Sequence, residues 1–164
     1  MSEISTVTSF LEGCYSRLSN VDYSSVDSLL HDDFVFDDDN GQHDKPSYLY
    51  AFLPAWESLV STSRLRIVSI ALCSEKLDGK SVVLAEWETD YICQEGAKWG
   101  GVIPISGEKC GLKVLASFHL IDGKIIRLLQ RADDYYRHSG IESEVRRYII
   151  AQEDKSKALQ KESN

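Results

Sequence analysis

The residues best suited to chemistry lie in one short segment, FVFDDDNGQHD, at positions 34–44. In an extended strand, alternate side chains share a face, so Asp38 is expected on the same side as Phe34 and Phe36. A carboxylate among apolar side chains loses hydration, which disfavours its charged form and makes it a stronger base. The spacing therefore predicts Asp38 as a general base, and His43 can move its proton.

The other aspartates of this segment have a simpler interpretation. Asp37, Asp39 and Asp44 are predicted to be solvated turn and helix-capping residues. A calcium loop aligned on Gly41 would place Phe36 at the first carboxylate position, so that site is excluded. The four cysteines are far apart, without a CxxC or Cys/His spacing. We therefore expect reduced thiols and no metal site.

Other candidate residues are spread along the chain. Tyr15 borders an apolar helical stripe, where it is either a core tyrosine with a satisfied hydroxyl or a hydrogen-bond donor to a substrate oxyanion. Asp133 follows the last predicted strand and is a second candidate acid or base. No glycine-rich phosphate loop and no G-x-S-x-G elbow occur, so we expect cofactor-free proton transfer. The expected substrate-binding residues are Phe36, Trp56, Trp87, Tyr91, Ala116, Phe118 and Gln130.

Three helices are expected to position these groups from the N-terminal side. Apolar residues recur at helical spacing over 7–18 and over 23–30, and Asp22 or Ser24 can cap the second stretch. Pro46 suits the start of a third helix, whose buried face runs from Leu49 to Val60. Pro54 lies inside that third stretch, where its missing N–H predicts a kink or break.

Strands follow, separated by turn signals. The pattern predicts a short strand over 34–36 and longer ones over 64–73, 81–92, 112–121 and 124–131. Asp-Gly pairs at 78–79 and 122–123 predict hairpins, and 95–107 reads as a longer loop. Helices followed by a meander indicate an α+β fold, in which a cone-shaped, curved antiparallel sheet wraps around the N-terminal helices.

Two motifs then show a resemblance to a known family. LLHDDFVFDD is similar to the passage leaving the second helix of ketosteroid isomerases, and FHLIDGKIIRLLQRADD is similar to the strand-turn-strand of SnoaL-like proteins. With the order of elements over residues 4–140, the chain resembles the nuclear-transport-factor-2-like (NTF2-like) superfamily. This resemblance implies a cystatin-like α+β barrel as a single domain over 1–140. Residues 141–164 are expected to form a helical or partly disordered extension.

The resemblance also implies roles for individual residues. Asp38 falls at the position of the isomerase general base, and Tyr15 matches its oxyanion-binding tyrosine. Ala116 stands where the isomerases have a protonated aspartate, so half of that oxyanion hole is absent. The Asp-Arg-Asp set of limonene epoxide hydrolase is not reproduced, because Gln130 replaces its last aspartate. The resemblance therefore carries over the fold and a candidate base, without one defined reaction.

The composition limits the partners of the chain. Its 164 residues carry a net charge of −8 with a pI of about 5.0, which argues against nucleic acid as a partner. The absence of a long apolar run and of an export leader predicts a cytoplasmic protein without a membrane anchor. The expected function is an isomerase or cyclase, or a dehydratase or epoxide hydrolase, acting on a hydrophobic oxygenated small molecule such as a polyketide or terpenoid intermediate. The alternative is a non-catalytic module of the same fold that binds a ligand or dimerises.

A homodimer is also expected. Leu115, Ser117, His119 and Ile121 share one face of their strand, with a mixture of apolar and amphipathic side chains that suits a twofold contact. SnoaL-like proteins, which this chain resembles, commonly pair through the outer face of the sheet. Three acidic side chains would repel their copies in such a contact unless they lie at its rim or meet arginine or lysine, namely Glu86, Glu88 and Asp90.

Overall fold

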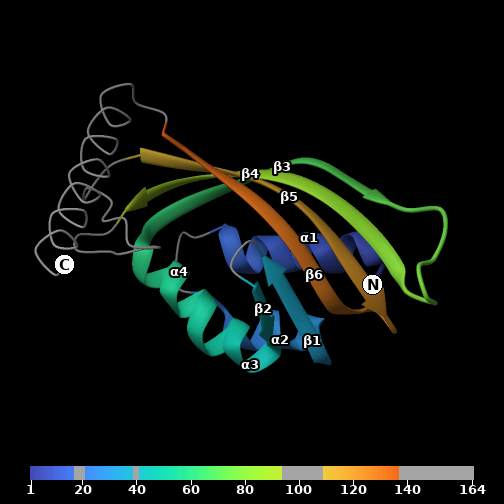
Figure 1. Cartoon of the computed structure of the whole chain (residues 1–164). Coiled ribbons are helices and arrows are strands. Elements are labelled where there is room, and N and C mark those ends of the chain that lie inside the picture. Colours follow the sequence, from blue (N-terminus) through green and yellow to red (C-terminus); the bar gives the residue numbers. More distant parts are fainter. Residues whose placement is uncertain (17–20, 39–40, 94–108, 137–164) are drawn as a thin grey trace, which may run out of the picture.

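The computed structural model of the protein describes residues 1–16, 21–38, 41–93 and 109–136 (Figure 1). Helical segments come first and long strands follow, as the sequence predicts. The elements are α1 Glu3–Tyr15, α2 Tyr23–Leu29, β1 Leu30–Asp38, β2 Gly41–Asp44, α3 Lys45–Ser47, the π-helical turn η1 Tyr48–Phe52, α4 Leu53–Leu59, β3 Val60–Leu72, β4 Ser81–Cys93, β5 Lys109–Ile121 and β6 Lys124–Tyr136. The domain boundary predicted at residue 140, the extension 141–164 and the loop over 95–107 lie outside the described residues.

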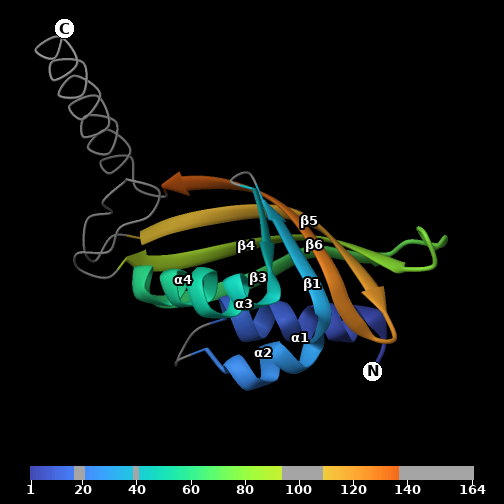
Figure 2. The same ribbon diagram turned by 60° about the horizontal axis from the view of Figure 1, so that its bottom comes forward.

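The described strands form one six-stranded sheet with the order β2-β1-β6-β5-β4-β3. The sheet curves over α1, and the consecutive helical segments α3, η1 and α4 lie on the same side of the sheet as α1 (Figures 1 and 2). This confirms an α+β fold with a curved, unclosed sheet around the N-terminal helices. The sheet is mixed rather than antiparallel, because β1 runs parallel to β6. No hairpin joins these two strands: helices and four further strands separate them in the chain, so their direction is not imposed locally.

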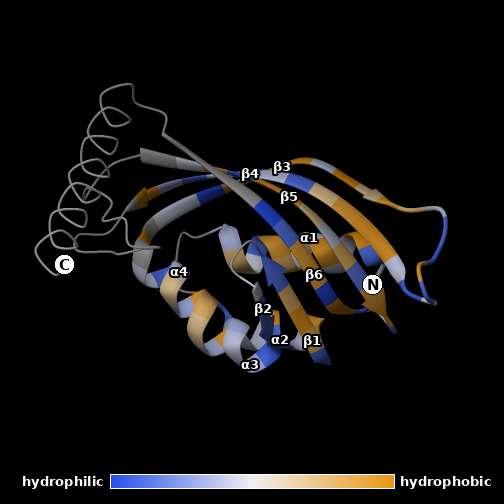
Figure 3. Ribbon diagram, viewed as in Figure 1, coloured by the Kyte–Doolittle hydropathy of each residue, from blue (hydrophilic) through white to orange (hydrophobic). Residues whose placement is uncertain are grey.

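Helix α1 supplies the centre of the core. Its apolar stripe is buried against the concave face of the sheet, and Figure 3 shows the apolar colouring along the helix and the strands above it. The Ser2 hydroxyl accepts a hydrogen bond from the Ser5 amide at 3.2 Å and satisfies one free amide at the start of the helix. Helix α1 ends at Tyr15, so this tyrosine lies in the last turn, directly below the sheet.

The third predicted helix is irregular next to Pro54, where the sequence predicts a kink or break. The Leu53 amide bonds to the Tyr48 carbonyl, five residues back, and this wider turn precedes α4. Proline occupies the first turn of α4, where its missing N–H costs no hydrogen bond. Val60, which the sequence placed in this helix, begins β3 instead, since its backbone adopts the extended conformation of a β-branched residue.

The two Asp-Gly hairpins are confirmed. Asp78 and Asp122 have φ of 51°, and the glycines that follow them have φ of 77° and 76°. Two successive residues with positive φ make the tight turn whose twist matches that of the flanking strands. These turns set the register of β3 with β4 and of β5 with β6, and so decide which side chains face the inside of the cone.

Two of the three acids on the outer face of β4 form ion pairs with neighbouring strands. Glu88 forms ion pairs with Arg66 and with Lys113, and the Asp90 carboxylate lies 2.8 Å from the Arg64 guanidinium. These pairs join β4 to β3 and β5 across the outer face of the sheet. The condition set by the sequence for an outer-face contact, that these acids meet arginine or lysine, is therefore fulfilled among the described residues for Glu88 and Asp90 but not for Glu86, which is exposed beside Leu115.

Candidate active site

Asp38 is the last residue of β1 and lies on the inner side of the sheet. Phe34 and Phe36 are buried on the same face, as strand alternation predicted, and the Asp38 side chain is only 13% exposed. Strand β2 pairs with β1 and brings His43 opposite Phe36, where the two rings stack at 5.8 Å. The His43 Nε2 atom is 3.8 Å from the Asp38 carboxylate, and its side chain is 36% exposed. The imidazole is thus the more exposed of the two side chains.

Tyr15 reaches the same region from α1. It is buried, and its hydroxyl donates a hydrogen bond to Gln130 Oε1 on β6 at 3.3 Å. Burial raises the pKa of Tyr15 well above its ordinary value. The neighbouring Cys14 and Asp38 side chains raise this pKa further, and hydrogen bonds with Tyr48 and Gln130 lower it. The phenol therefore remains protonated and can donate a hydrogen bond. The effect of Asp38 on this pKa is the weakest of its causes and links α1 electrostatically to the end of β1.

Tyr48 is the residue of this network that sequence reasoning missed. It is fully buried in η1, and its hydroxyl is 3.7 Å from the Cys14 Sγ atom. Its ring packs against Phe36 at 5.0 Å and against Phe52 at 5.3 Å. The helical spacing of Tyr48 and Phe52 was the available signal. Burial raises the pKa of the Cys14 thiol to about 12, so this cysteine is not a thiolate nucleophile.

The predicted aromatic wall is assembled on the inner face. Tyr15 contacts Trp56 and Trp87 with ring centroids 5.7 and 5.6 Å apart, and Trp56 meets Tyr91 at 5.2 Å. Phe118 lies 6.2 Å from Trp87. All of the side chains predicted to bind substrate are buried, namely Phe36, Trp56, Trp87, Tyr91, Ala116, Phe118 and Gln130. The apolar ones form one continuous part of the core with the Tyr15 ring.

On the inner face of β4, two buried polar atoms have no hydrogen-bond partner among the described residues. Trp87 and Thr89 follow each other on the inner face of β4, and both are 0% exposed. Neither the indole N–H of Trp87 nor the Thr89 hydroxyl meets an acceptor or donor. Leaving such a group unsatisfied costs about 1–3 kcal/mol, so these atoms are available to an oxygen of a bound molecule.

Replacing the Thr89 hydroxyl tests this description. Because Thr89→Val removes an unsatisfied polar group while keeping the branched shape, we expect it to raise the free energy of unfolding by about 1 kcal/mol. Urea denaturation followed by tryptophan fluorescence measures the change. Thr62→Val, at an exposed position on β3, is the matched control and should stay within about 0.5 kcal/mol of the wild type. A loss of stability in Thr89→Val would show that the hydroxyl is satisfied.

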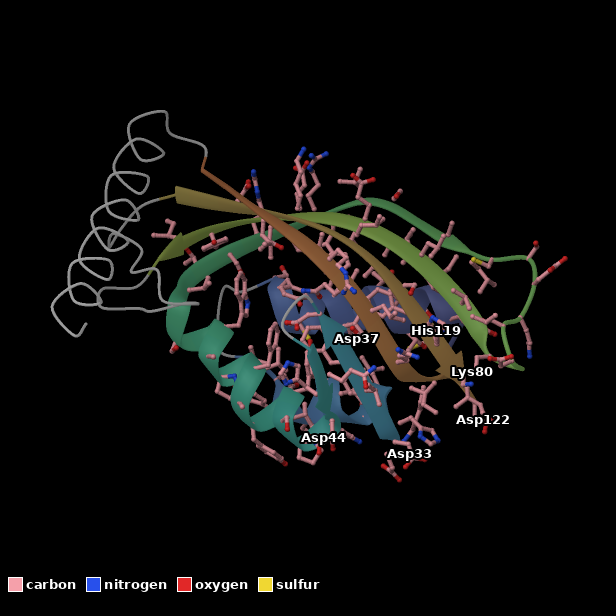
Figure 4. The ribbon with its side chains drawn as sticks, in the orientation of Figure 1. Asp33, Asp37, Asp44, Lys80, His119 and Asp122 are labelled. Carbon is pink, nitrogen blue, oxygen red and sulfur yellow. The ribbon has the colours of Figure 1, made fainter. Side chains whose placement is uncertain are left out.

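The remaining sequence candidates fall elsewhere. Asp133 lies within β6, not after it, and pairs in register with Lys113; its side chain is outside the described ones. Asp44 is a helix cap, as predicted, and accepts a hydrogen bond from the Ser47 amide at 2.9 Å. Asp39 is outside the described residues. Figure 4 shows Asp37 and Asp44 on their strands.

The prediction that Asp37 is a solvated turn residue is wrong. Its carboxylate is 18% exposed, lies 3.1 Å from the Arg127 guanidinium and accepts a hydrogen bond from Gln42 at 3.0 Å. The hydrogen bonds from Gln42 and Arg127 lower the pKa of Asp37. Because side chains alternate along β1, Asp37 faces outward, toward Arg127 of β6, and Asp38 faces inward.

Among the described residues, no three histidine, cysteine, aspartate or glutamate side chains gather as a metal site.

Comparison with known proteins rests on structure alone. No protein-family model matches the sequence, and no curated protein matches it. An LEH-like epoxide hydrolase from M. tuberculosis superposes with a TM-score of 0.57 at 20% identity, over 80% of this chain and 82% of the hydrolase. An NTF2-like protein from Exiguobacterium gives a TM-score of 0.61 at 14% identity, over 79% of this chain and 99% of its own. The chain has the NTF2-like fold.

A third structure with this fold is IdmH from Streptomyces antibioticus, a proposed polyketide cyclase. It matches with a TM-score of 0.63 at 13% identity, over 81% of this chain and 93% of IdmH. The resemblance seen in the sequence motifs is thus confirmed at the level of the fold, which solved proteins described as enzymes share. No helix among the described residues has the length and apolar character needed to cross a membrane.

Proposed function

We propose that this NTF2-like protein is a cofactor-independent acid/base enzyme that acts on a hydrophobic, oxygenated small molecule. Isomerisation or cyclisation is the reaction class that the residues suit best, and dehydration or epoxide opening uses the same groups. The observation that supports the proposal is that Asp38, 13% exposed on the face of Phe34 and Phe36, raises the pKa of the buried Tyr15 hydroxyl. A base and a hydrogen-bond donor in one apolar interior are the minimum for proton transfer next to a carbonyl.

The roles follow from the chemistry of each side chain. The Asp38 carboxylate takes a proton from a carbon beside the substrate carbonyl, and the electron pair moves onto the carbonyl oxygen. Tyr15 donates a hydrogen bond to that developing oxyanion. Asp38 then returns the proton to another carbon, or passes it to His43, which lies 3.8 Å away and reaches solvent. The indole of Trp87 and the Thr89 hydroxyl bind a second substrate oxygen.

One observation favours the alternative, a non-catalytic ligand-binding module. The Tyr15 hydroxyl already donates to Gln130 at 3.3 Å, the pattern of a structural tyrosine. In a catalytic site the substrate oxyanion must replace Gln130 as acceptor, and the charge that develops on the oxygen makes it the stronger one. In a binding module Gln130 keeps the bond.

A panel of small substrates tests the proposal. A β,γ-unsaturated ketone reports isomerisation, a β-hydroxyketone reports dehydration and a hydrophobic epoxide reports ring opening, each followed by absorbance or chromatography. We expect turnover of at least one compound above the rate in buffer, together with quenching of tryptophan fluorescence on binding. Saturable binding of these compounds without turnover of any would favour the binding module.

We also propose that the protein forms a homodimer through the outer face of the sheet. In one register row, Leu84 of β4 and Leu129 of β6 flank Ser117, and Leu115 lies beside them, 63% exposed. We call Leu84, Leu115 and Leu129 the outer apolar patch. The ion pairs of Glu88 and Asp90 lower the charge barrier to pairing two copies, and Glu86, exposed beside Leu115, must lie at the rim of the contact.

Light scattering at micromolar concentration checks the assembly. The expected mass is about twice the 18.5 kDa of one chain. Leu115→Glu should return the mass to that of a single chain, because a buried carboxylate would face its symmetry copy. Asp122→Asn, in the β5–β6 turn and away from the patch, is the control. A single-chain mass for the wild-type protein would refute the dimer.

A further inference from the structure

A separate hollow lies on the outer side of the sheet, away from the candidate active site. Its volume is about 310 Å³, and β1, β2, the β3–β4 turn, β5 and β6 all contribute to its walls. We call it the outer cleft and define it by Lys80, His119 and Arg127, together with the apolar side chains of Leu77 and Ile126. None of the leucines of the outer apolar patch lines it.

Three nitrogen-bearing side chains converge in this cleft from different strands. His119 of β5 pairs in register with Arg127 of β6, and Lys80 precedes β4 beside them. Figure 4 shows Lys80 and His119 on neighbouring segments. Among the described residues Lys80 has no ion pair, and the Nε atom of Arg127 is buried without an acceptor. A buried guanidinium N–H without a partner points to a missing anionic or oxygen ligand.

The charges nearest to His119 have one sign. Burial lowers the pKa of His119, and the positive charges of Arg127 and Lys80 lower this pKa further. Its only described side-chain partner is the Ser117 hydroxyl, 3.4 Å from Nε2. Although the cleft also carries the Asp33 and Asp78 carboxylates, the side of it formed by Lys80, His119 and Arg127 is cationic. An anion bound there would offset the repulsion among these groups.

The acids around the cleft stand at its edge or are already paired. Asp37 is held by Arg127 and Gln42 and does not line the cleft. The Asp33 side chain is 86% exposed and lies 3.8 Å from His31, and Asp78 is exposed in the β3–β4 turn. These two carboxylates line the cleft and oppose a doubly charged ligand more than a singly charged one. The apolar side chains beside the cationic floor suit a ligand with a hydrocarbon part.

From this arrangement we propose that the outer cleft binds a small organic carboxylate. Its carboxylate lies between the Lys80 ammonium and the Nε–H of Arg127, and its hydrocarbon part contacts Leu77 and Ile126. The volume is at the lower limit of ligand sites, which restricts the ligand to a short chain or a single ring. The site lies on the opposite side of the sheet from Asp38, and it does not depend on the function proposed for the interior.

Hexanoate is the probe, and the His119 imidazole is the reporter. Titration of His119 by NMR, assigned with His119→Gln, should show that saturating hexanoate raises the pKa of His119 by about one, because a nearby negative charge stabilises the imidazolium. Binding should therefore tighten as the pH falls through that pKa. Asp33, Asp78, Lys80 and Arg127 are the other charged groups that line the cleft, and His119 is the group that the NMR titration follows.

Controls separate a built site from general charge effects. Hexanol, of the same length but neutral, should leave the pKa of His119 unchanged, and acetate should bind more weakly because it lacks the apolar part. Lys80→Gln should weaken hexanoate binding about tenfold, whereas Lys124→Gln, an exposed lysine that does not line the cleft, should not. A second readout is the melting temperature of the wild type and of each variant, compared between hexanoate and chloride at equal ionic strength.

Three results would overturn the proposal. These are a pKa of His119 that hexanoate does not move, a response to hexanoate that survives in Lys80→Gln, and a larger response to inorganic phosphate than to hexanoate. The last result would identify a site for phosphate and not for an organic carboxylate.

Discussion

Asp38→Asn is expected to lower the turnover rate by about 10²–10⁴-fold on whichever substrate of the panel is converted. The amide keeps the shape of the side chain and its place at the end of β1, but it cannot take a proton. Because the Asp38 side chain is only 13% exposed and accompanies two buried phenylalanines, removing its charge should not unfold the protein. Initial rates at saturating substrate, with a urea melt of the same sample, separate the two effects.

Asp37→Asn is the matched control for this change. Asp37 precedes Asp38 on the same strand and faces the opposite side, where it pairs with Arg127. We expect its substitution to leave the turnover rate nearly unchanged and to reduce stability by removing an ion pair. The general-base assignment would be wrong if Asp38→Asn kept most of the wild-type rate, or if both variants lost activity equally.

Tyr15→Phe has the second large effect, an expected loss of about 10²–10³-fold in turnover rate. Phenylalanine fills the same space between Trp56 and Trp87, so the aromatic packing remains. The lost hydroxyl is the donor to the developing oxyanion and also the donor to Gln130. Its removal should cost only about 1 kcal/mol of folding stability, because one neutral hydrogen bond is lost.

Tyr50→Phe provides the control, since Tyr50 is 78% exposed in η1 and carries the same chemical change. Its turnover rate and stability should match the wild type. If Tyr15→Phe lost stability but kept its turnover rate, Tyr15 would be a structural tyrosine, as its bond to Gln130 permits. The binding-module alternative would then gain support, provided that Asp38→Asn was also without effect.

Local patterns in the sequence were enough to predict most of the elements. The apolar stripe over 7–18 determines α1, because helical spacing collects its apolar residues on one side. The Asp-Gly pairs at 78–79 and 122–123 determine two hairpins, since tight turns need positive φ at both positions. Strand alternation likewise put Asp38 with Phe34 and Phe36, and the structure agrees. All of these depend on residues within a few positions of each other.

Contacts between distant residues were decided only by the tertiary structure. The parallel pairing of β1 with β6 brings Asp37 next to Arg127, and alternation by itself described that aspartate as solvated. Tyr48 joins the polar network because a π-helical turn and not a regular helix precedes Pro54. Lys80 meets His119 and Arg127 because two hairpins and their registers place three strand segments together. Register and strand order depend on packing of the whole sheet, and no short stretch of sequence contains that information.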